Sequence, residues 1–425
     1  MDARSLQRGQ CKLDCAMTRL NSLTSTHDKS AEVAVTKSIS SPSDLAVNGA
    51  APLFSEPVHV GRPNVGNRKR FDALVDKMFE RNWLSNDGPA LREFEAAISA
   101  RLGVRNCVAI CNGTIALEIA IRALELKGEV IVPSYTFVAT AHALQWQEIT
   151  PVFADIDPVT QNLDPEAVMR MLTPRTTGIL GVHLWGRAAP VEALGKIAAS
   201  HGLKILYDAS HGFGCTYGGT SLGSFGDCEV FSFHATKFFN TFEGGAVVTN
   251  NDELAAKMRL MRNFGFAGYD NVIYPGTNGK MAEICAAMGL TNLASLDDFV
   301  ALNKANYDAY REVFSAVRGV RMLEYPQGER NNFQYIVLSI EPEFGIRRDD
   351  LIRVLHAENV LARRYFWPGC HRMEPYKSYY PNAGLLLPRT IETAEKVVVL
   401  PNGSSVSRPT IEAIADIVRW AGAAG

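Results

Sequence analysis

The chain has 425 residues, of which 43 are Lys or Arg and 45 are Asp or Glu, so its formal net charge is −2. This balance argues against a dedicated nucleic-acid or polyanion binder. A 47% hydrophobic fraction is typical of a globular protein. No apolar run approaches the roughly 18 residues that a membrane-spanning helix needs. We therefore expect neither a nucleic acid nor a membrane as partner, and the length predicts two or three domains.

The number and spacing of the cysteines indicate whether disulfides or a metal site are expected. The chain has eight cysteines, and none of them forms a CxxC pair. This spacing indicates neither a disulfide framework nor a zinc site. We expect free thiols, no metal centre and, from composition, a cytoplasmic protein.

The first fifty residues differ from the rest of the chain. Residues 1–50 are rich in Ser, Thr, Asn, Lys and Asp and lack sustained apolar periodicity. Such a composition predicts a disordered or loosely attached extension.

Residues 51–280 have the pattern of an α/β domain. Leu91, Phe94, Ile98 and Leu102 recur at helical spacing, and Gly103 stands where a C-cap is expected. Between residues 106 and 250, helical stretches alternate with seven short apolar runs: NCVAIC, EVIVP, PVFAD, TGILGVHL, LKILYDA, CEVFSFH and GGAVVTN. This alternation predicts a mostly parallel seven-stranded sheet with helices on both faces.

The pattern changes after residue 250. We expect a helix over about 252–262, an irregular Gly- and Asn-rich stretch over 263–280, and a long helical region over about 281–317. The last hundred residues mix a strand pattern (NNFQYIVLSI) with helical ones (DDLIRVLHAEN, TIEAIADIVRWAG). The sequence therefore predicts a linking helix and a smaller α+β domain over 281–425.

A strand-to-helix turn with small residues is the first candidate binding element. In CNGTIALEIAIRALEL, Gly113 lets the backbone approach a ligand closely. The free amides after Thr114 lie at the positive end of a helix dipole, where phosphate binds. By itself the motif is also a common turn and N-cap.

Two further motifs carry ionisable groups. In LYDASHGFG, Asp208 ends an apolar strand, where side chains point into the ligand crevice of such folds, and His211 follows three positions later. In FSFHATKFFNTFEGG, Lys237 is surrounded by phenylalanines, which favours a neutral, nucleophilic amine. Taken singly, the aspartate could merely cap a turn, and the lysine could extend its head to water. A phosphate turn, a strand-end Asp and a sheltered Lys together are what a pyridoxal-phosphate site requires.

Residues from about 58 to the C-terminus resemble the DegT/DnrJ/EryC1/StrS sugar aminotransferases, a branch of fold-type I pyridoxal-phosphate enzymes. The resemblance rests on the order and spacing of nine motifs: WLSNDGP, CNGTIAL, PSYTFVATAHAL, PVFADIDP, YDASHGFG, GSFGD, SFHATKFFNTFEGG, GTNGKM and RRYFWPGCHRMEPY. Within the family the chain is most similar to the transaminases that act at C4 of dTDP-4-keto-6-deoxyglucose. The resemblance implies an aminotransferase fold and pyridoxal 5'-phosphate as cofactor.

The resemblance also assigns roles to residues. Lys237 would form the Schiff base and shuttle the proton, while Asp208 would pair with the pyridine nitrogen. The other implied cofactor contacts are a histidine near the phenolic oxygen, an aromatic ring stacked on the cofactor, and the phosphate ligands: His211, Phe137, Gly113, Thr114 and Ser232. Asn278 would reach the phosphate from the neighbouring subunit, which implies a homodimer with shared active sites.

The sequence does not decide which residues contact the substrates. Tyr365 and His371, in YFWPGCH, are candidates near the sugar, and packing between the domains explains them equally well. Arg262 and Asn263 are similarly ambiguous.

The expected reaction is transfer of an amino group from glutamate to the 4-keto carbon of a dTDP-linked 6-deoxyhexose. Action at a 3-keto carbon is the nearest rival. A non-catalytic protein that binds sugar nucleotides is a second alternative, against which Lys237 and Asp208 argue. A dehydratase is disfavoured because relatives with that activity carry His in place of the lysine.

Overall fold

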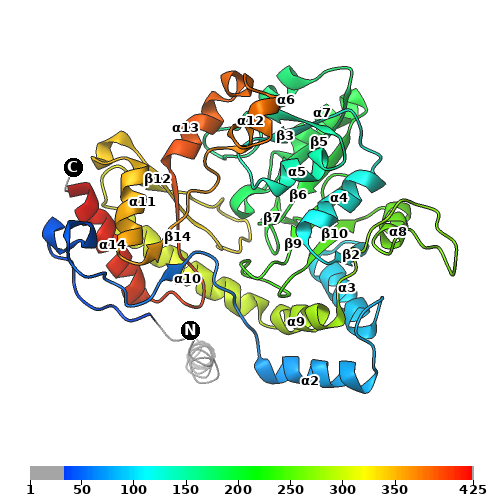
Figure 1. Cartoon of the computed structure of the whole chain (residues 1–425), viewed down its shortest axis with the longest axis horizontal. Helices are drawn as coiled ribbons and strands as arrows, with labels where there is room; N and C mark the ends of the chain where they lie inside the picture. Colours follow the sequence, from blue (N-terminus) through cyan, green and yellow to red (C-terminus); the bar gives the residue numbers. More distant parts are fainter. Residues whose placement is uncertain (1–32, 424–425) are drawn as a thin grey trace, which may run out of the picture. The chain divides into compact units, whose positions relative to one another are not determined.

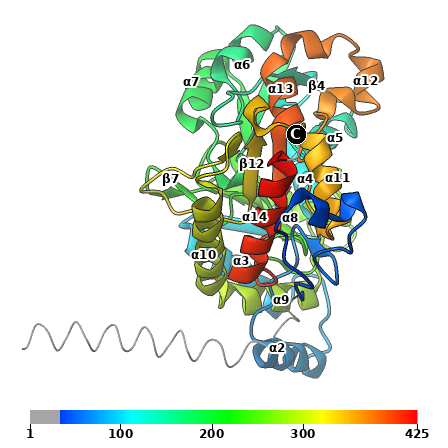
Figure 2. The ribbon, with the colours of Figure 1, turned by 90° about the vertical axis from the view of Figure 1, so that its left-hand side faces the viewer.

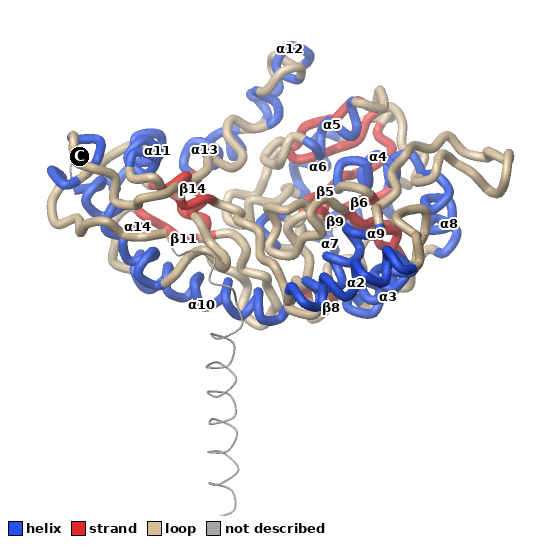
Figure 3. The backbone as a smooth tube through the Cα atoms, turned by 60° about the horizontal axis from the view of Figure 1, so that its bottom comes forward, coloured by secondary structure: helices blue, strands red, loops and turns tan. Residues whose placement is uncertain are grey.

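The computed structural model describes residues 33–423, which belong to one compact unit. Within it, two lobes share the chain: a large lobe around a seven-stranded sheet and a small lobe around a three-stranded sheet (Figure 1). Figure 3 shows these strands as two separate groups. No single helix in the described part of the chain is long and apolar enough to cross a membrane; the bent pair Glu283–Leu293 and Leu296–Phe314 passes that test only when taken together.

The large sheet contains all seven predicted strands. Their order is β2 (Asn106–Ile110), β10 (Gly245–Thr249), β9 (Cys228–Ser232), β6 (Lys204–Asp208), β5 (Thr176–Val182), β3 (Glu129–Pro133) and β4 (Thr150–Ala154). Only β10 runs antiparallel to its neighbours, so the predicted, mostly parallel sheet is confirmed. Both faces of these strands are apolar because helices cover both sides.

Two helical layers cover this sheet. One face packs against α4 (Gly113–Ala123), α5 (Ala139–Gln145) and α8 (Asp252–Met261). The other packs against α3 (Pro89–Leu102), α6 (Pro165–Met171), α7 (Val191–His201) and α9 (Glu283–Leu293). Gly103 ends α3 in the left-handed conformation, at φ 71°, as expected of a C-cap.

The small lobe has a core of its own. Its antiparallel sheet has the order β11 (Val320–Met322), β12 (Ile336–Ile340) and β14 (Val397–Leu400). The helices that share its core are α10 (Leu296–Phe314), α11 (Arg348–Ala357) and α14 (Arg408–Ala423). Two further helices, α12 (Tyr376–Tyr379) and α13 (Pro388–Lys396), lie between β13 (Val360–Leu361) and β14.

The single helical region expected over 281–317 is two helices. Helix α9 packs on α3 and on α2 (Arg68–Glu80) in the large lobe, whereas α10 packs on α14 in the small lobe. The two helices meet at 61°. The chain bends because each helix buries its apolar side against a different lobe.

The prediction of a disordered extension over 1–50 is wrong for residues 33–50; residues 1–32 lie outside the described part. The segment 33–58 runs beside α11 and α14 (Figure 2), and β1 (Val58–His59) pairs with β13. Five of its side chains are buried in the small-lobe core before β1 begins: Val33, Ile39, Leu45, Leu53 and Phe54. These apolar residues are spaced irregularly because the segment wraps the lobe mostly without regular structure. A search for helical or strand spacing therefore does not find them.

A mixed core joins the lobes. Tyr135, Val182 and Trp185 of the large lobe pack with Tyr335 and Phe366 of the small lobe. The carboxyl ends of β3 and β5 therefore face the small lobe, and this junction positions the candidate site.

Candidate active site

A cavity of about 720 Å³ lies at the carboxyl edge of the large sheet, against the small lobe. Eight of the ten predicted site residues line it: Gly113, Thr114, Phe137, Asp208, His211, Ser232, Lys237 and Tyr365. They come from the last residues of β6 and β9 and from segments that follow β2, β3, β6, β9 and β13. The fold thus brings the three separately predicted motifs into one site.

One wall of this cavity is suited to an anion. The Asn112 side chain caps α4 by accepting the Ile115 amide at 2.8 Å, and the amides of Gly113 and Thr114 have no acceptor within the helix. A Cβ on Gly113 would lie 2.9 Å from the Cβ of Ser232, so only glycine lets this turn approach the serine so closely. The result is a cradle of backbone amides with hydroxyl groups from Thr114 and Ser232.

Asp208 is buried, and both oxygens of its carboxylate accept a hydrogen bond. Thr140 Oγ1 donates to its Oδ2 at 2.9 Å, and the Ser210 amide donates to its Oδ1 at 3.0 Å. Asp208 is the last residue of β6, and its side chain reaches the cavity from the sheet edge. Such a carboxylate can hold a proton on a ligand nitrogen placed beside it.

Lys237 follows β9 in a tight turn, with its amide bonded to the His234 carbonyl. Burial lowers the pKa of its ammonium to about 8, and the negative charge of Asp208 opposes this shift only in part. The amine is therefore partly neutral near pH 8, as a nucleophile or a general base requires.

His211 lies in an aromatic stack with its ring fixed. Its Nδ1 accepts the Trp185 amide at 3.2 Å, and its ring lies 4.5 Å from that of Tyr335 between centroids. Burial, and then the nearby Lys237, hold the pKa of His211 well below its usual range. The neutral ring therefore carries its proton on Nε2 and has one donor to offer.

Aromatic side chains from both lobes form the rim. Phe137 is 57% exposed, although it is apolar and touches the edge of Phe366 at 6.5 Å between centroids. An exposed phenylalanine in a cavity wall is positioned for a flat ligand.

Two predicted residues lie outside the cavity. His371 is buried, and its Nδ1 bonds to the Ser134 hydroxyl at 2.7 Å, so the structure does not place it in the cavity wall as a sugar contact. Asn278 is exposed and pairs through the backbone with Asn263. It does not line the cavity of its own chain.

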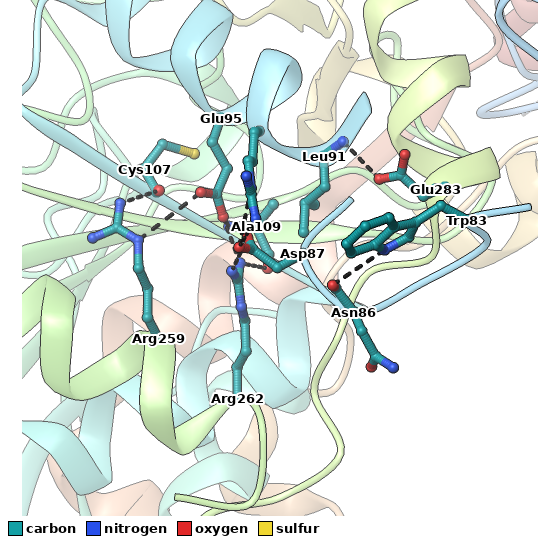
Figure 4. Close-up of polar contacts among 11 residues, drawn as sticks. Trp83, Asn86, Asp87, Leu91, Glu95, Cys107, Ala109, Arg259, Arg262 and Glu283 are labelled. Atoms are coloured by element: carbon teal, nitrogen blue, oxygen red, sulfur yellow. Dashed lines mark hydrogen bonds and ion pairs between the residues drawn. The ribbon is translucent and has the colours of Figure 1, made fainter. Parts of the chain in front are cut away.

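The WLSNDGP loop is anchored to a buried ion pair rather than to the cavity (Figure 4). Arg262 donates to the Glu95 carboxylate, to the Ala109 carbonyl at 2.8 Å and to Asp87 at 3.4 Å. Glu283 accepts the amides of Ala90 and Leu91 at the start of α3. Arg262, ambiguous from sequence, is therefore a structural residue that links α8, α3 and this loop.

Other residues of the site were not predicted. Thr140 orients Asp208. The one feature of the sequence that could have identified it is its position one helical turn after Thr136 in PSYTFVAT. Tyr335 and Arg363 line the cavity from the small lobe, and no local motif marks them.

Comparison with known proteins shows the family of this chain. The model of the DegT/DnrJ/EryC1/StrS aminotransferase family matches residues 66–419. The chain is 38% identical over 370 residues to a dTDP-4-amino-4,6-dideoxy-D-glucose transaminase of Shigella dysenteriae, covering 86% of this chain and 99% of the relative. It is 33% identical over 352 residues to an Escherichia coli transaminase of the same name, covering 82% and 94%.

Solved structures are similar over the same region. The structure of DesI in the presence of its TDP-sugar product matches with a TM-score of 0.86 at 46% identity, covering 89% of this chain and 96% of that one. DesV of S. venezuelae, solved with a ketimine intermediate, matches with a TM-score of 0.77 at 32% identity, covering 83% and 95%. The chain belongs to the DegT/DnrJ/EryC1/StrS aminotransferase family.

Proposed function

We propose that this aminotransferase uses pyridoxal 5'-phosphate to move the amino group of glutamate to C4 of dTDP-4-keto-6-deoxyglucose, giving dTDP-4-amino-4,6-dideoxyglucose. The observation that carries the proposal is that Lys237, Asp208 and the amide cradle at Gly113 line one cavity. The similarity to two transaminases named for this amino sugar supports the choice of substrate.

The cavity fits the cofactor. The glycine cradle beside Ser232 suits the phosphate, Asp208 suits the ring nitrogen, and Phe137 offers an exposed ring face. His211 offers its Nε2 hydrogen to an oxygen acceptor. When bound, pyridoxal phosphate supplies a reactive carbonyl and a ring that withdraws electrons from the substrate carbon.

Lys237 moves the protons of both half-reactions. Because its pKa is about 8, Nζ can take a proton from the α-carbon of glutamate as a base. The same group would then pass that proton to the reactive carbon of the bound cofactor, and in the second half-reaction it would take a proton back from that carbon and deliver it to C4 of the sugar. Asp208 would keep a proton on the ring nitrogen of the cofactor, and the hydrogen bonds from Thr140 and Ser210 fix the orientation of its carboxylate.

A homodimer is part of the proposal. Large apolar side chains are exposed around the WLSNDGP loop, in the 263–280 segment and at the start of α9: Trp83, Leu84, Phe264, Phe266, Val272, Ile273 and Ile284. Clustered exposed apolar residues are typical of a surface that a second copy covers. Asn278 belongs to the same segment, so such a dimer can carry it to the cavity of the other subunit.

A cytoplasmic location remains a prediction of the sequence.

The test is a direct assay of the sugar nucleotide. The purified, cofactor-loaded enzyme is incubated with glutamate and dTDP-4-keto-6-deoxyglucose, and the product mass is read by mass spectrometry. We expect the ketone to be replaced by an amine, and the product to be absent with Lys237→Ala.

The rival functions give different results in this assay. If the ketone stays unchanged while glutamate alone still alters the cofactor absorbance, a 3-keto sugar or another sugar replaces the 4-keto substrate. If glutamate has no effect either, the protein is a sugar-nucleotide binder without transaminase activity.

A further inference from the structure

The segment that follows β1 packs against the loop that carries Lys237. This segment, residues 60–66, leads from the small lobe, where β1 pairs with β13, to α2 of the large lobe. Gly61 lies against Thr236, the residue before Lys237. A Cβ on Gly61 would be 3.0 Å from the Thr236 carbonyl oxygen and 3.2 Å from the Thr236 Cβ. The lysine loop therefore rests on a piece of chain that is far from it in sequence.

Asn64 of this segment bonds directly to the lysine loop. The residue is 1% exposed, and its Nδ2 donates to the Phe238 carbonyl at 3.1 Å while its Oδ1 accepts the Ser404 amide at 3.2 Å. The backbone carbonyl of Asn64 accepts a hydrogen bond from Asn240 Nδ2 at 2.9 Å. Asn64 thus holds the loop one residue after Lys237 and again three residues after it.

A second buried asparagine joins the same two pieces of chain. Asn292 of α9 accepts the Gly66 amide at 2.8 Å and donates to the Asn240 carbonyl at 2.8 Å. Each of these bonds satisfies a backbone group in the protein interior, where an unmade hydrogen bond is costly. Residues 60–66 with Asn240 and Asn292 therefore form one hydrogen-bonded clamp on the lysine loop.

Lys237 stands in a loop that depends on its surroundings for its shape. Residues 233–244 join β9 to β10 and form neither a helix nor a strand. Such a loop keeps one conformation through its contacts with the rest of the protein. The lysine side chain is long and flexible, so the position of Nζ depends on how well the backbone below it is fixed. A displacement of about 1 Å at a reacting atom can cost roughly 100-fold in rate.

We propose that Asn64 is a positioning residue for the reaction, and that the clamp holds the loop so that Nζ of Lys237 meets the reacting carbon. The inference rests on the proposed function, because it takes Lys237 as the reactive amine. The clamp also connects the lobes: β1 pairs with β13, and the segment after β13 brings Tyr365 to the catalytic cavity. One stretch of chain thus fixes the lysine relative to the small-lobe wall of that cavity.

The test compares two ligands of the full-length apoenzyme. In pyridoxal 5'-phosphate, Nζ of Lys237 bonds to the carbonyl carbon and the carbonyl oxygen leaves as water. Pyridoxine 5'-phosphate has an alcohol at that carbon and binds without this bond. We expect Asn64→Leu, which keeps a similar volume, to slow attachment of pyridoxal phosphate about 10- to 100-fold in stopped-flow absorbance. Calorimetry should show pyridoxine phosphate bound as tightly as by the parent.

The loaded enzyme gives a second readout of the same variant. In single turnovers with glutamate, the maximal rate should fall about 10- to 100-fold in Asn64→Leu, because the proton is moved by the displaced amine. The glutamate concentration that gives half of this rate should stay the same, since the clamp does not line the catalytic cavity except through Thr236, beside Lys237.

Thr249→Val is the matched control for the loss of a buried hydrogen bond. Thr249 is 2% exposed, and its hydroxyl donates to the Asp227 carbonyl at 2.7 Å. Asp227 precedes β9, so this bond lies at the edge of the sheet opposite the cavity. Attachment of pyridoxal phosphate should keep its parental rate in this variant. An equal slowing in Thr249→Val and Asn64→Leu would overturn the clamp.

A pair of glycine variants tests the clamp by contact and does not depend on how Asn64→Leu folds. Gly61 and Gly49 both have positive φ, at 78° and 99°, so alanine brings backbone strain at either position. At Gly61 the added methyl presses on Thr236, whereas at Gly49 no atom of the described residues lies within 4 Å of it. Gly61→Ala should slow attachment of pyridoxal phosphate, and Gly49→Ala should not.

Two outcomes overturn the inference. One is attachment of pyridoxal phosphate at the parental rate in both Asn64→Leu and Gly61→Ala. The other is weaker binding of pyridoxine phosphate by the same factor as the slowing, which would make Asn64 a general structural residue. Attachment that survives in Lys237→Ala is a different failure, because it refutes Lys237 as the reactive amine and the proposed function with it. The choice of keto-sugar does not enter, since no sugar is used.

Discussion

Thr140 Oγ1 donates a hydrogen bond to Asp208 Oδ2 over 2.9 Å, and both side chains are buried. A threonine has one hydroxyl hydrogen, so the 3.0 Å contact between Thr136 and Thr140 must be donated by Thr136. The first turn of α5 and the loop before it therefore form a hydrogen-bonded chain that ends on the carboxylate. Thr140 is a positioning residue, because it acts through Asp208.

Replacing Thr140 should slow the chemistry without unfolding the protein. Thr140→Val keeps the volume but removes the donor, and we expect the glutamate half-reaction to slow about 10-fold, since hydrogen bonds to charged groups are worth about 1.5–3 kcal/mol. Single-turnover absorbance of the bound cofactor measures this rate. Thr140→Ser keeps the hydroxyl and should restore most of it. Equal rates in the Val variant and the parent would contradict the positioning role.

The pKa of Lys237 predicts how cofactor uptake depends on pH. The neutral amine attacks, so attachment of the cofactor to the apoenzyme should accelerate about tenfold per pH unit below pH 8 and level off above it. Stopped-flow absorbance over pH 6–10 tests this. A rate that kept rising to pH 10 would mean an unshifted lysine.

The lowered pKa of Lys237 also makes the free energy of unfolding depend on pH. The folded value of about 8 lies below the ordinary 10.5, so the unfolded chain binds more protons between these pH values. The stability of the apoenzyme should therefore rise with pH across that window. Lys237→Met should remove this rise, which urea unfolding at pH 7.5 and pH 10 can measure. An equal rise in both proteins would exclude Lys237 as its cause.

Local patterns were sufficient for much of the fold. Each of the seven strands could be predicted because a buried parallel strand is a short apolar run between helical stretches. Residues 33–50 could not, because their buried side chains follow no helical or strand period. The break between α9 and α10 was missed because both helices keep helical periodicity and only their packing partners differ.

The site was predictable where a residue's role follows from its own motif. Gly113, Asp208 and Lys237 each stand at a strand end or turn with a recognisable chemistry, and they meet in one cavity. Tyr335 and Arg363 come from the small lobe, and sequence does not tell which of its residues face the large one. The position of His371 could not be predicted for the same reason: its motif is near the site, but its ring contacts Ser134 and does not line the cavity.

Arg262 should matter to stability. Arg262→Met leaves the buried Glu95 carboxylate with only the more distant Arg259, at 4.0 Å, and we expect a loss of about 3–5 kcal/mol, as for other broken buried pairs. Chemical denaturation measures this. The double variant Arg262→Met with Glu95→Leu should recover most of the loss, because no buried charge remains. Purely additive losses would mean that the two side chains do not act as a pair.

Glu358 should hold the segment 33–54 on the small lobe. The fully buried carboxylate accepts the amides of Ala46 at 2.5 Å and Leu53 at 2.6 Å. Glu358→Ala leaves both amides without this acceptor, and we expect about 2–4 kcal/mol of destabilisation. Limited proteolysis should then cut within 33–54 before the rest of the chain. Glu374→Ala, an exposed change near α12, is the control and should leave the cleavage pattern unchanged.

The proposal that two subunits share their active sites can be tested by mixing two inactive variants. Lys237→Ala and Asn278→Ala should each have little or no activity as separate dimers. If Asn278 serves the cavity of the other subunit, a mixed dimer has one site with both defects and one with neither. Mixing equal amounts and allowing subunits to exchange should therefore restore about one quarter of parental activity, because half of the dimers are mixed and half of their sites are intact. If Lys237 and Asn278 of one chain served the same cavity, each site of a mixed dimer would carry one of the two substitutions. No activity would then return.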